Sequence, residues 1–472
     1  MSVITNRTEV ATSKEKRIAM DMLEYVLDKN HPERYIKDSV SLEKSTLTLK
    51  NNSFSIRGKN VYVIGAGKSS YQMAKALEDE IGDKIKGGFV NSLEPKSKLK
   101  YIKNNVVSHP FPSKATIDAT KQIFDIQKKI KKDDVILFLL SGGASSMFAL
   151  PPDDIAIDDF FRTYEILVRS GIKIDKINSI RKHISQVKGG NISKIFNDQK
   201  IFTLLLSDVL SGDVSIVGSG PTDYDKSSFS EVLEIIKENK LKLPDSVMDH
   251  IKLGSKGKID ETLKTMPENS RIYLLGDGRN VLESARSFCK TKKLDHTELV
   301  TSIDGDALKA SKEITKELSK VEKRPLVLIG VGETTTKVPE KGAKGGRNQH
   351  LILSLLKELD KLSAPWSVLS FDTDGKDFVE GIGGAIIDHQ SRLKLLEQDR
   401  EKDLDDALKR YASTDLLSSI GATIKSSETG INFCDIFVVV LGIYRVKTTK
   451  KASSSKKNPN KSKSTTRRSR KK

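Results

Sequence analysis

Short apolar runs rich in β-branched residues alternate along the chain with longer amphipathic stretches. Parallel strands that are buried on both faces are typically runs of this kind, and amphipathic helices cover them. The pattern therefore predicts an α/β fold built on parallel sheets. The runs predicted as strands are VYVIG (61–65), GGFV (87–90), NVVS (105–108), DVILFLL (134–140), FTLLLSDV (202–209), RIYLLGD (271–277), PLVLIG (325–330), WSVLSFD (366–372), GAIID (384–388) and FCDIFVVVLG (433–442).

The length of the chain predicts more than one domain. Single hydrophobic cores stop growing at about 250 residues, and this chain has 472. A polar, turn-rich stretch from about residue 240 to 269 separates the two groups of strands. We therefore expect an N-terminal α/β domain over residues 1–255, a second α/β domain over 256–444 and a basic tail over 445–472.

Glycine clusters follow several predicted strands, at the edge where ligands collect in open α/β sheets. The first is GAGKSS, residues 65–70. It is not a P-loop, because Tyr62 stands where that motif needs glycine, and Ser70 stands where the dinucleotide fingerprint needs its third glycine. Backbone N–H groups at a helix start, together with Lys68, would favour an anion. A tight strand-to-helix turn with a solvated lysine is the alternative.

A second cluster, SGGASSM (141–147), follows the most apolar strand. Its glycines and serines present backbone and hydroxyl donors without bulk, which suits a phosphate or carboxylate. A purely structural turn is the alternative. In NSIRKHISQVKGGN (178–191), a continuous helix would place Arg181, Ser185 and Lys188 on one face as a basic stripe, although most such stripes are only solvated.

Aspartates after strands are candidate Mg²⁺ ligands, because Mg²⁺ takes one or two carboxylates beside water and phosphate oxygens. Asp208 and Asp213 precede the turn SGPT, and Asp374 lies in FDTDGKD. Helix capping and turn formation compete with this interpretation. Farther along, GVGETTTKV (330–338) and KGAKGGRNQH (341–350) place Arg347 at the start of a helix, where its planar fork can bind phosphate or carboxylate.

Seven motifs in order give the chain a family resemblance. GAGK, SGGxS, RKHxSxVKGG, LSDVxxGDxxxxxSGPTxxD, GExTxxV, KGGRNQ and TDG together resemble the glycerate 2-kinases, the glycerate kinase family with a C-terminal MOFRL domain, over roughly residues 10–442. The chain departs from the family pattern at Asp372, which replaces a glycine, after Asp377, and in the shortened loop TGINFCD (429–435).

The resemblance implies two α/β/α three-layer domains with mainly parallel sheets around an interdomain active-site cleft. It also implies transfer of the γ-phosphoryl group of ATP to the 2-hydroxyl of D-glycerate with a divalent cation such as Mg²⁺, giving 2-phosphoglycerate. Lys68 and Arg347 are the expected catalytic residues, and Asp208, Asp213 and Asp374 the expected metal ligands. The residues expected to bind substrate or phosphate are Gly65, Ala66, Gly67, Ser69, Ser141, Gly142, Gly143, Ser145, Arg181, Lys188, Ser219, Gly220, Glu333, Thr334, Gly345, Gly346 and Asn348.

Composition and the distribution of charge narrow the classes of protein to which the chain can belong. The net charge is +18, but residues 445–472 hold 13 Lys or Arg and no Asp or Glu, so the rest of the chain is nearly balanced. A tail of this composition predicts disorder and at most weak, salt-sensitive polyanion binding. No apolar run is long enough for a membrane helix, no signal peptide is evident, and two cysteines fit a reducing compartment, so we expect a cytoplasmic enzyme, either as a monomer or as a homo-oligomer. A SIS-type sugar-phosphate isomerase and a polyanion-binding protein are the alternatives.

Overall fold

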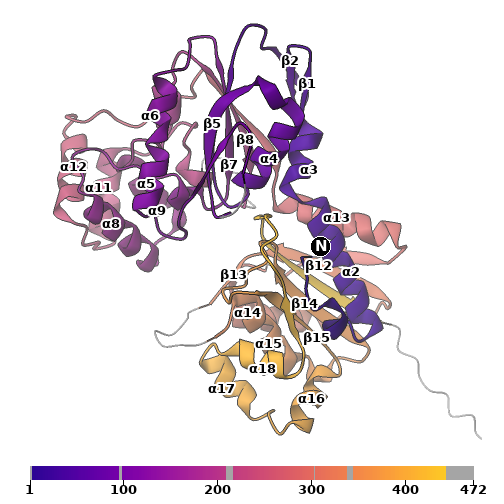
Figure 1. Cartoon of the computed structure of the whole chain (residues 1–472). Coiled ribbons are helices and arrows are strands. Elements are labelled where there is room, and N and C mark those ends of the chain that lie inside the picture. The colour runs from indigo at the N-terminus through magenta and orange to yellow at the C-terminus, as the bar shows by residue number, and fades with distance from the viewer. Residues whose placement is uncertain (1–2, 95–97, 209–215, 302, 337–343, 443–472) are drawn as a thin grey trace, which may run out of the picture.

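The computed structural model describes residues 3–94, 98–208, 216–301, 303–336 and 344–442. In these residues, two six-stranded sheets lie one above the other in Figure 1, each covered by helices. The first sheet has the order β6-β5-β4-β7-β8-β9, and every neighbouring pair is parallel. Its strands are β4 (Val61–Ala66), β5 (Ile85–Ser92), β6 (Lys103–Val106), β7 (Val135–Ser141), β8 (Lys200–Leu206) and β9 (Ser270–Gly276).

Alternate residues of these strands face two separate helical layers. Val61, Val63 and Leu137 belong to a core on the side of α3 and α4, whereas Ile64 and Phe138 belong to a core on the opposite side. The helices of the first domain are α3 (Pro32–Ser39), α4 (Ser70–Ile81), α5 (Lys114–Thr120), α6 (Gln122–Gln127), α7 (Ala144–Met147) and α10 (Asn191–Ile195). A further helical unit with its own core consists of α8 (Ile157–Arg169), α9 (Ile174–His183), α11 (Phe229–Glu238) and α12 (Asp245–Ser255).

The second sheet has the order β10-β12-β17-β14-β15-β16. Only its β10–β12 pair is parallel among the described strands, so the expectation of a mainly parallel sheet holds for the first domain and not for this one. The α/β class itself is confirmed. The strands are β10 (His296–Glu298), β12 (Leu326–Gly332), β14 (Trp366–Asp372), β15 (Ile382–Asp388), β16 (Thr423–Lys425) and β17 (Asp435–Leu441).

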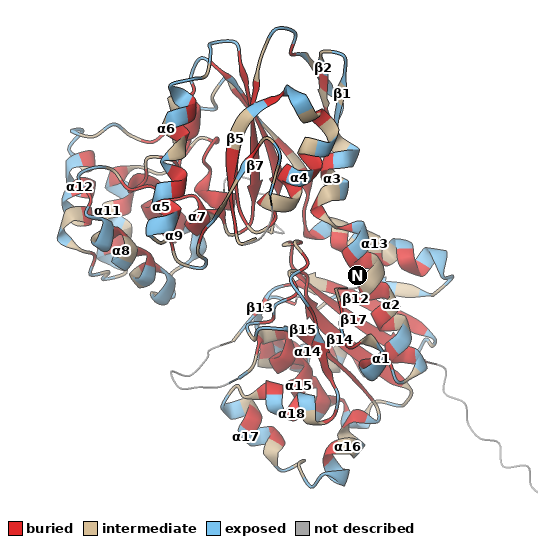
Figure 2. Cartoon of the chain, in the orientation of Figure 1, coloured by how far each residue is buried: buried red, intermediate tan, exposed pale blue. Residues whose placement is uncertain are grey.

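Helices cover both faces of the second sheet as well. On one face, α2 (Lys14–Lys29) and α13 (Gly278–Thr291) pack on the side chains of Ile329, Leu369 and Val438. On the other, α14 (Ala307–Leu318), α15 (Arg347–Glu358), α17 (Asp403–Lys409) and α18 (Ser413–Ser419) pack on Val368 and Val439. Figure 2 shows the strands buried and the outer helix faces exposed. The smaller elements are α1 (Arg7–Val10), β1 (Val40–Glu43), β2 (Thr46–Leu49), β3 (Asn52–Ser55), β11 (Gly305–Asp306), β13 (Thr334–Thr335), α16 (Ser391–Glu397), and the 3-10 turns η1 (Gly82–Lys84), η2 (Val217–Ser219) and η3 (Leu359–Lys361).

The sheets divide the chain differently from the sequence-based boundary at residue 255. The strand β9, expected to open the second domain, pairs with β8 at the edge of the first sheet. The N-terminal helix α2, expected in the first domain, packs on the second sheet. The chain therefore passes between the domains twice, near Asn30 and near Asp277, and the stretch from residue 240 to 269 contains helix α12 instead of a linker.

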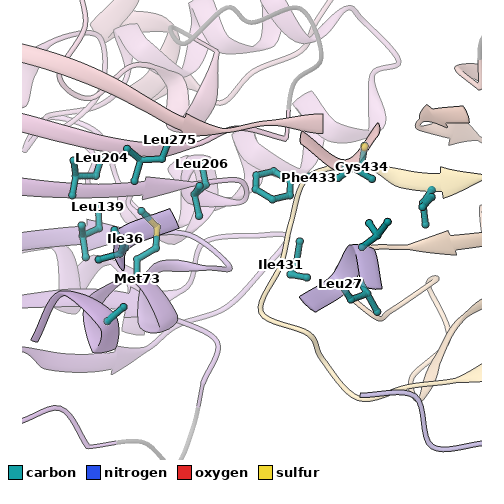
Figure 3. Close-up of a cluster of buried hydrophobic side chains, with 14 of the residues drawn as sticks. Leu27, Ile36, Met73, Leu139, Leu204, Leu206, Leu275, Ile431, Phe433 and Cys434 are labelled. Carbon is teal, nitrogen blue, oxygen red and sulfur yellow. The ribbon is translucent and has the colours of Figure 1, made fainter. Parts of the chain in front are cut away.

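A hydrophobic seam joins the two domains. Leu206 and Leu275 from the first sheet lie near Phe433, which precedes β17 of the second (Figure 3). Tyr35 also contacts the Phe433 ring edge-on, with centroids 5.5 Å apart. These contacts hold the carboxyl edge of the first sheet against the second domain. No helix in the described part of the chain is long and apolar enough to span a membrane.

Candidate active site

Lys68 stands in the loop between β4 and α4, and the end of β7 fixes that loop. Gly67 has φ +126°, and a Cβ there would overlap Ser141, so glycine is required. The backbone N–H of Lys68 donates to Gly142 O (2.9 Å), and that of Ser69 donates to Ser141 Oγ (3.1 Å). The N–H groups expected to bind an anion are thus used inside the protein, and the loop serves to position the lysine side chain.

The Lys68 ammonium reaches across to the second domain. Its Nζ lies 2.7 Å from Asp374 Oδ2 and 3.2 Å from Asn432 Oδ1. Asn432 also donates through Nδ2 to Asp208 at 3.3 Å, so this amide connects two first-domain residues. Burial opposes the charge of the lysine, but the Asp374 carboxylate outweighs it and raises the pKa of Lys68. In turn, although burial opposes ionisation, Lys68 lowers the pKa of Asp374.

Arg347 is the first residue of α15 and is held by three carboxylates. Nε and Nη2 donate to the two oxygens of Asp435 at 2.7 and 2.8 Å, which is a bidentate pair. Nη2 also donates to Asp372 at 2.7 Å, and Nη1 lies 2.8 Å from Glu333 Oε1. Burial works against the charge, but these carboxylates raise the pKa of Arg347, so the guanidinium is fully ionised and fixed in orientation.

Asp377 supports this helix start and is not free for a metal. Its carboxylate accepts hydrogen bonds from the backbone N–H groups of Asn348 (3.0 Å) and Gln349 (2.9 Å). A Cβ on Gly346 would overlap Asp377, so glycine there lets the aspartate approach the helix end. Asn348 is buried in the same network, where its side-chain carbonyl accepts a hydrogen bond from Ser370. Capping, one of the two alternatives for these loop aspartates, is the role of Asp377.

One cavity of about 780 Å³ lies between the domains and is lined by both Lys68 and Arg347. Carboxylates dominate the rest of its polar wall. Burial raises the pKa of Asp208 to about 6, and burial together with Asp435 and Asp374 raises the pKa of Asp372 well above its usual value. An acidic wall of this kind, facing two fixed cations, is suited to a substrate that brings negative charge together with a cation.

The predicted site residues fall into two groups. The residues that line the cavity are Lys68, Gly143, Asp208, Glu333, Thr334, Gly345, Gly346, Arg347 and Asp374. Behind this wall lie Gly65, Ala66, Gly67, Ser69, Ser141, Gly142, Ser145, Arg181, Lys188, Ser219, Gly220 and Asn348. Asp213 lies outside the described residues, as does the basic tail. The second group therefore shapes the cleft from behind, with Arg181 as a special case treated below.

The basic stripe of Arg181, Ser185 and Lys188 does not form. Helix α9 ends at His183, so the two later residues leave the helix axis. Lys188 instead turns inward, is fully buried, and donates to the carbonyl oxygens of Phe148 (2.9 Å) and Gly218 (3.2 Å). Its role in this structure is to tie two loops together.

Sequence reasoning missed several residues of the cavity wall and its support. Asn432 and Asp435 hold the two cationic side chains; Asn432 lies in the loop 429–435, noted only as a departure from the family pattern, and Asp435 lies in the predicted apolar strand 433–442. His109 lines the cavity directly after the predicted strand NVVS, and its position at a strand end was the available signal. Asp372 was noted only as a departure from the family pattern, yet it bonds to Arg347.

Comparison with known proteins gives consistent matches. Residues 18–252 match the family described as domain of unknown function (DUF4147), and residues 326–435 match the MOFRL family. A glycerate 2-kinase of Pyrococcus horikoshii is 32% identical and aligns over 88% of this chain and 95% of its own. A D-glycerate 2-kinase of Thermotoga maritima is 30% identical over 90% and 97%. The crystal structure of a glycerate kinase from Thermotoga maritima superimposes with a TM-score of 0.77 at 28% identity, covering 90% of this chain and 99% of that one.

Proposed function

This chain belongs to the glycerate 2-kinase family, and we propose that it transfers the γ-phosphoryl group of ATP to the 2-hydroxyl of D-glycerate, giving 2-phosphoglycerate and ADP. The observation that supports this most is that Lys68 and Arg347, 279 positions apart, line a single cavity between the domains. Phosphoryl transfer depends mainly on positioning and on neutralising charge that spreads over the transferred group. Two cationic side chains, contributed by opposite walls of a cleft, suit that requirement.

Lys68 is the group that must change partners during the reaction. In the structure it neutralises Asp374, and a phosphate entering the cleft would compete with that carboxylate for the ammonium. Because the side chain is flexible and keeps three donors, it can follow the phosphoryl oxygens between donor and acceptor. Arg347, in contrast, keeps its position, because the bidentate pair with Asp435 fixes the plane of the guanidinium. It can act as an oriented positive charge at one end of the site.

A divalent cation fits the donor chemistry of the cleft without a preformed metal cage. Among the described residues, no group of three or more His, Cys, Asp or Glu side chains is arranged to hold a metal ion. Mg²⁺ retains several waters and takes phosphate oxygens from the nucleotide, so Asp208 and Asp374 suffice as protein ligands. When bound, Mg²⁺ neutralises charge on the phosphates. We place the reaction in the cytoplasm, because the two cysteines are buried free thiols.

The reaction itself tests this proposal. The enzyme is mixed with ATP, MgCl₂ and D-glycerate, and the product is identified by ³¹P and ¹H NMR. We expect phosphate on the 2-hydroxyl, equimolar ADP, and no reaction with glycerol, which lacks the carboxylate. A phosphate on the 3-hydroxyl, or no product with any nucleoside triphosphate, would overturn the assignment. A sugar-phosphate isomerase would instead be stabilised thermally by a phosphosugar alone and not by MgATP.

A further inference from the structure

Arg181 is a buried cation without a counter-ion in the described part of the chain. It lies near the end of α9, its side chain is only 6% exposed, and it makes no ion pair or hydrogen bond to any described residue. Among the described residues, the Arg181 Nε is fully enclosed and has no hydrogen-bond partner. Burial without a compensating carboxylate lowers the pKa of Arg181.

An unpaired buried charge destabilises a fold, because the desolvation of the ion is not offset by an attraction. The Arg181 guanidinium lies over a ring face, with Cζ 4.8 Å from the centroid of Tyr164, and that contact recovers a small part of the cost. Arg347 shows the contrasting arrangement, since three carboxylates surround it. Of these two arginines, Arg181 is the one whose donors are not hydrogen-bonded to any residue that the structure describes.

The surroundings of Arg181 are those of an anion site. The Tyr164 hydroxyl donates to Ser145 O at 3.2 Å, and the Ser145 hydroxyl lies 3.3 Å from that of Ser219. Ser219 in turn donates to Asn178, which is one helical turn before Arg181 on α9. The Tyr164 ring that Arg181 contacts is thus connected to a chain of hydroxyl, amide and backbone groups, and the Arg181 charge adds to burial in lowering the pKa of Lys188.

The loop that follows β7 connects the surroundings of Arg181 with the cleft between the domains. Gly143 and His109 line the cavity, and Ser145 is two residues beyond Gly143. The Arg181 charge is felt at that wall, because it adds to burial and to Lys68 in lowering the pKa of His109 to about 4. Arg181 therefore lies behind the wall that Gly143 and His109 form, within electrostatic reach of the first-domain end of the cavity.

We propose that Arg181 binds the carboxylate of the acceptor acid, with the Ser145 hydroxyl as a neighbouring donor, and so orients the 2-hydroxyl toward the reacting phosphate. This rests on the proposed function and adds the acceptor's subsite to it. Arg347, the other arginine that the sequence offers for a phosphate or carboxylate, is already hydrogen-bonded to Asp435 and Asp372 and paired with Glu333. The phosphates of ATP then belong to the remaining cleft near Lys68 and Arg347.

Arg181→Met and Arg181→Lys test the subsite, with Arg162→Met as the matched control, because Arg162 is an exposed arginine on α8 of the same helical unit. For Arg181→Met we expect the KM for D-glycerate to rise about 10- to 100-fold, as for loss of a charge-assisted pair. The KM for ATP should change less than about threefold. Arg181→Lys should fall between the methionine variant and wild type, and the control should match wild type.

Binding measured without nucleotide gives a readout that does not depend on turnover. In calorimetric titrations, wild type and Arg162→Met should bind D-glycerate, and Arg181→Met should not. The unliganded methionine variant should melt at the wild-type temperature or above it, which shows that it folds and that the lost charge was unpaired. A variant that melts well below wild type would contradict the unpaired charge and with it the subsite.

The outcomes separate this inference from the proposed function. If wild type forms 2-phosphoglycerate but Arg181→Met binds and uses D-glycerate equally well, the carboxylate lies elsewhere and only the subsite is overturned. If the methionine variant loses affinity for ATP instead, Arg181 is a phosphate ligand, which also overturns it. If wild type binds D-glycerate through Arg181 but forms no phosphorylated product, the proposed function fails and the subsite stands.

Discussion

Lys68 Nζ and Asp374 Oδ2 lie 2.7 Å apart, so a residue at the carboxyl edge of the first sheet is ion-paired with a residue that follows β14 of the second. Together with Asn432, this pair connects the two walls of the cleft at its floor. The pair is available for exchange, because both side chains line the cavity. An incoming phosphate and its cation can replace each partner of the pair without leaving a charge unpaired.

Removing the lysine charge should stop catalysis and leave the fold intact. For Lys68→Ala we expect turnover to fall at least about 100-fold, because charge stabilisation of the transferred group is lost. Lys75→Ala is the control, since Lys75 is an exposed lysine on α4 that pairs with Glu33. Initial rates of ADP formation measure the effect. Turnover near that of wild type in Lys68→Ala would remove Lys68 from the catalytic machinery.

Arg347 should not be replaceable by lysine. A point charge cannot reproduce the bidentate pair with Asp435 together with the bonds to Asp372 and Glu333. We expect Arg347→Lys to lose at least about tenfold in turnover and about 1–3 kcal/mol in unfolding free energy, because buried carboxylates lose donors. Turnover assays and urea denaturation measure the two effects. Full activity in this variant would show that the planar fork is not needed.

The conformation of Gly67 should set the stability of the Lys68 loop. Gly67→Ala combines a positive φ with overlap on Ser141, whereas Gly58→Ala has a positive φ of +75° and open space around it. The control should cost about 1 kcal/mol and Gly67→Ala about 3 kcal/mol or more. Urea unfolding of both variants gives the two losses of unfolding free energy, and their difference is the cost of the overlap with Ser141. Equal losses would mean that the loop is not fixed against the end of β7.

The buried histidine of α15 should make stability depend on pH. Burial lowers the pKa of His350 to about 4, while its unfolded pKa is near 6.5, so the unfolded chain binds the proton first. Stability is therefore lost as the pH falls below about 6.5, by about 2 kcal/mol between pH 7.5 and pH 5 for this group. His350→Phe keeps the stacking on Tyr411 and should remove that part of the slope. Urea denaturation at several pH values measures the unfolding free energy. If that free energy depends on pH equally in the variant and in wild type, His350 is not the source of the loss.

The central strands could be predicted because they are short apolar runs with two buried faces, as in β7, where every residue is buried, whereas short polar strands such as β10 (His296–Glu298) carry no such signal and were not predicted. Their assignment to sheets could not, because the pairing of β9 with β8 brings together segments about 70 residues apart that share no local signal. The same limit applies to α2, whose apolar face fits either sheet until the whole chain is folded.

The candidate site, like the fold, could be predicted from the sequence only in part. Lys68 and Arg347 stand in glycine-rich loops, and such loops are typical of places where the backbone packs closely against another group. The order of the motifs indicates one family. Asp435 could not be found, because its function depends on lying opposite Asp372 in the antiparallel register of β17 and β14. That Arg181 has no counter-ion among the described residues was equally hidden, since a sequence does not show which charges are paired.

A double-mutant cycle on Lys68 and Arg347 tests most directly whether the two residues act at one site. Turnover of phosphoryl transfer to D-glycerate is measured for Lys68→Met, Arg347→Met and the double variant. Residues that stabilise one transition state together are strongly non-additive, so the double variant should be hardly slower than the slower single variant. Losses that multiply fully would show that the two cations act independently, in contradiction to a shared site across the cleft.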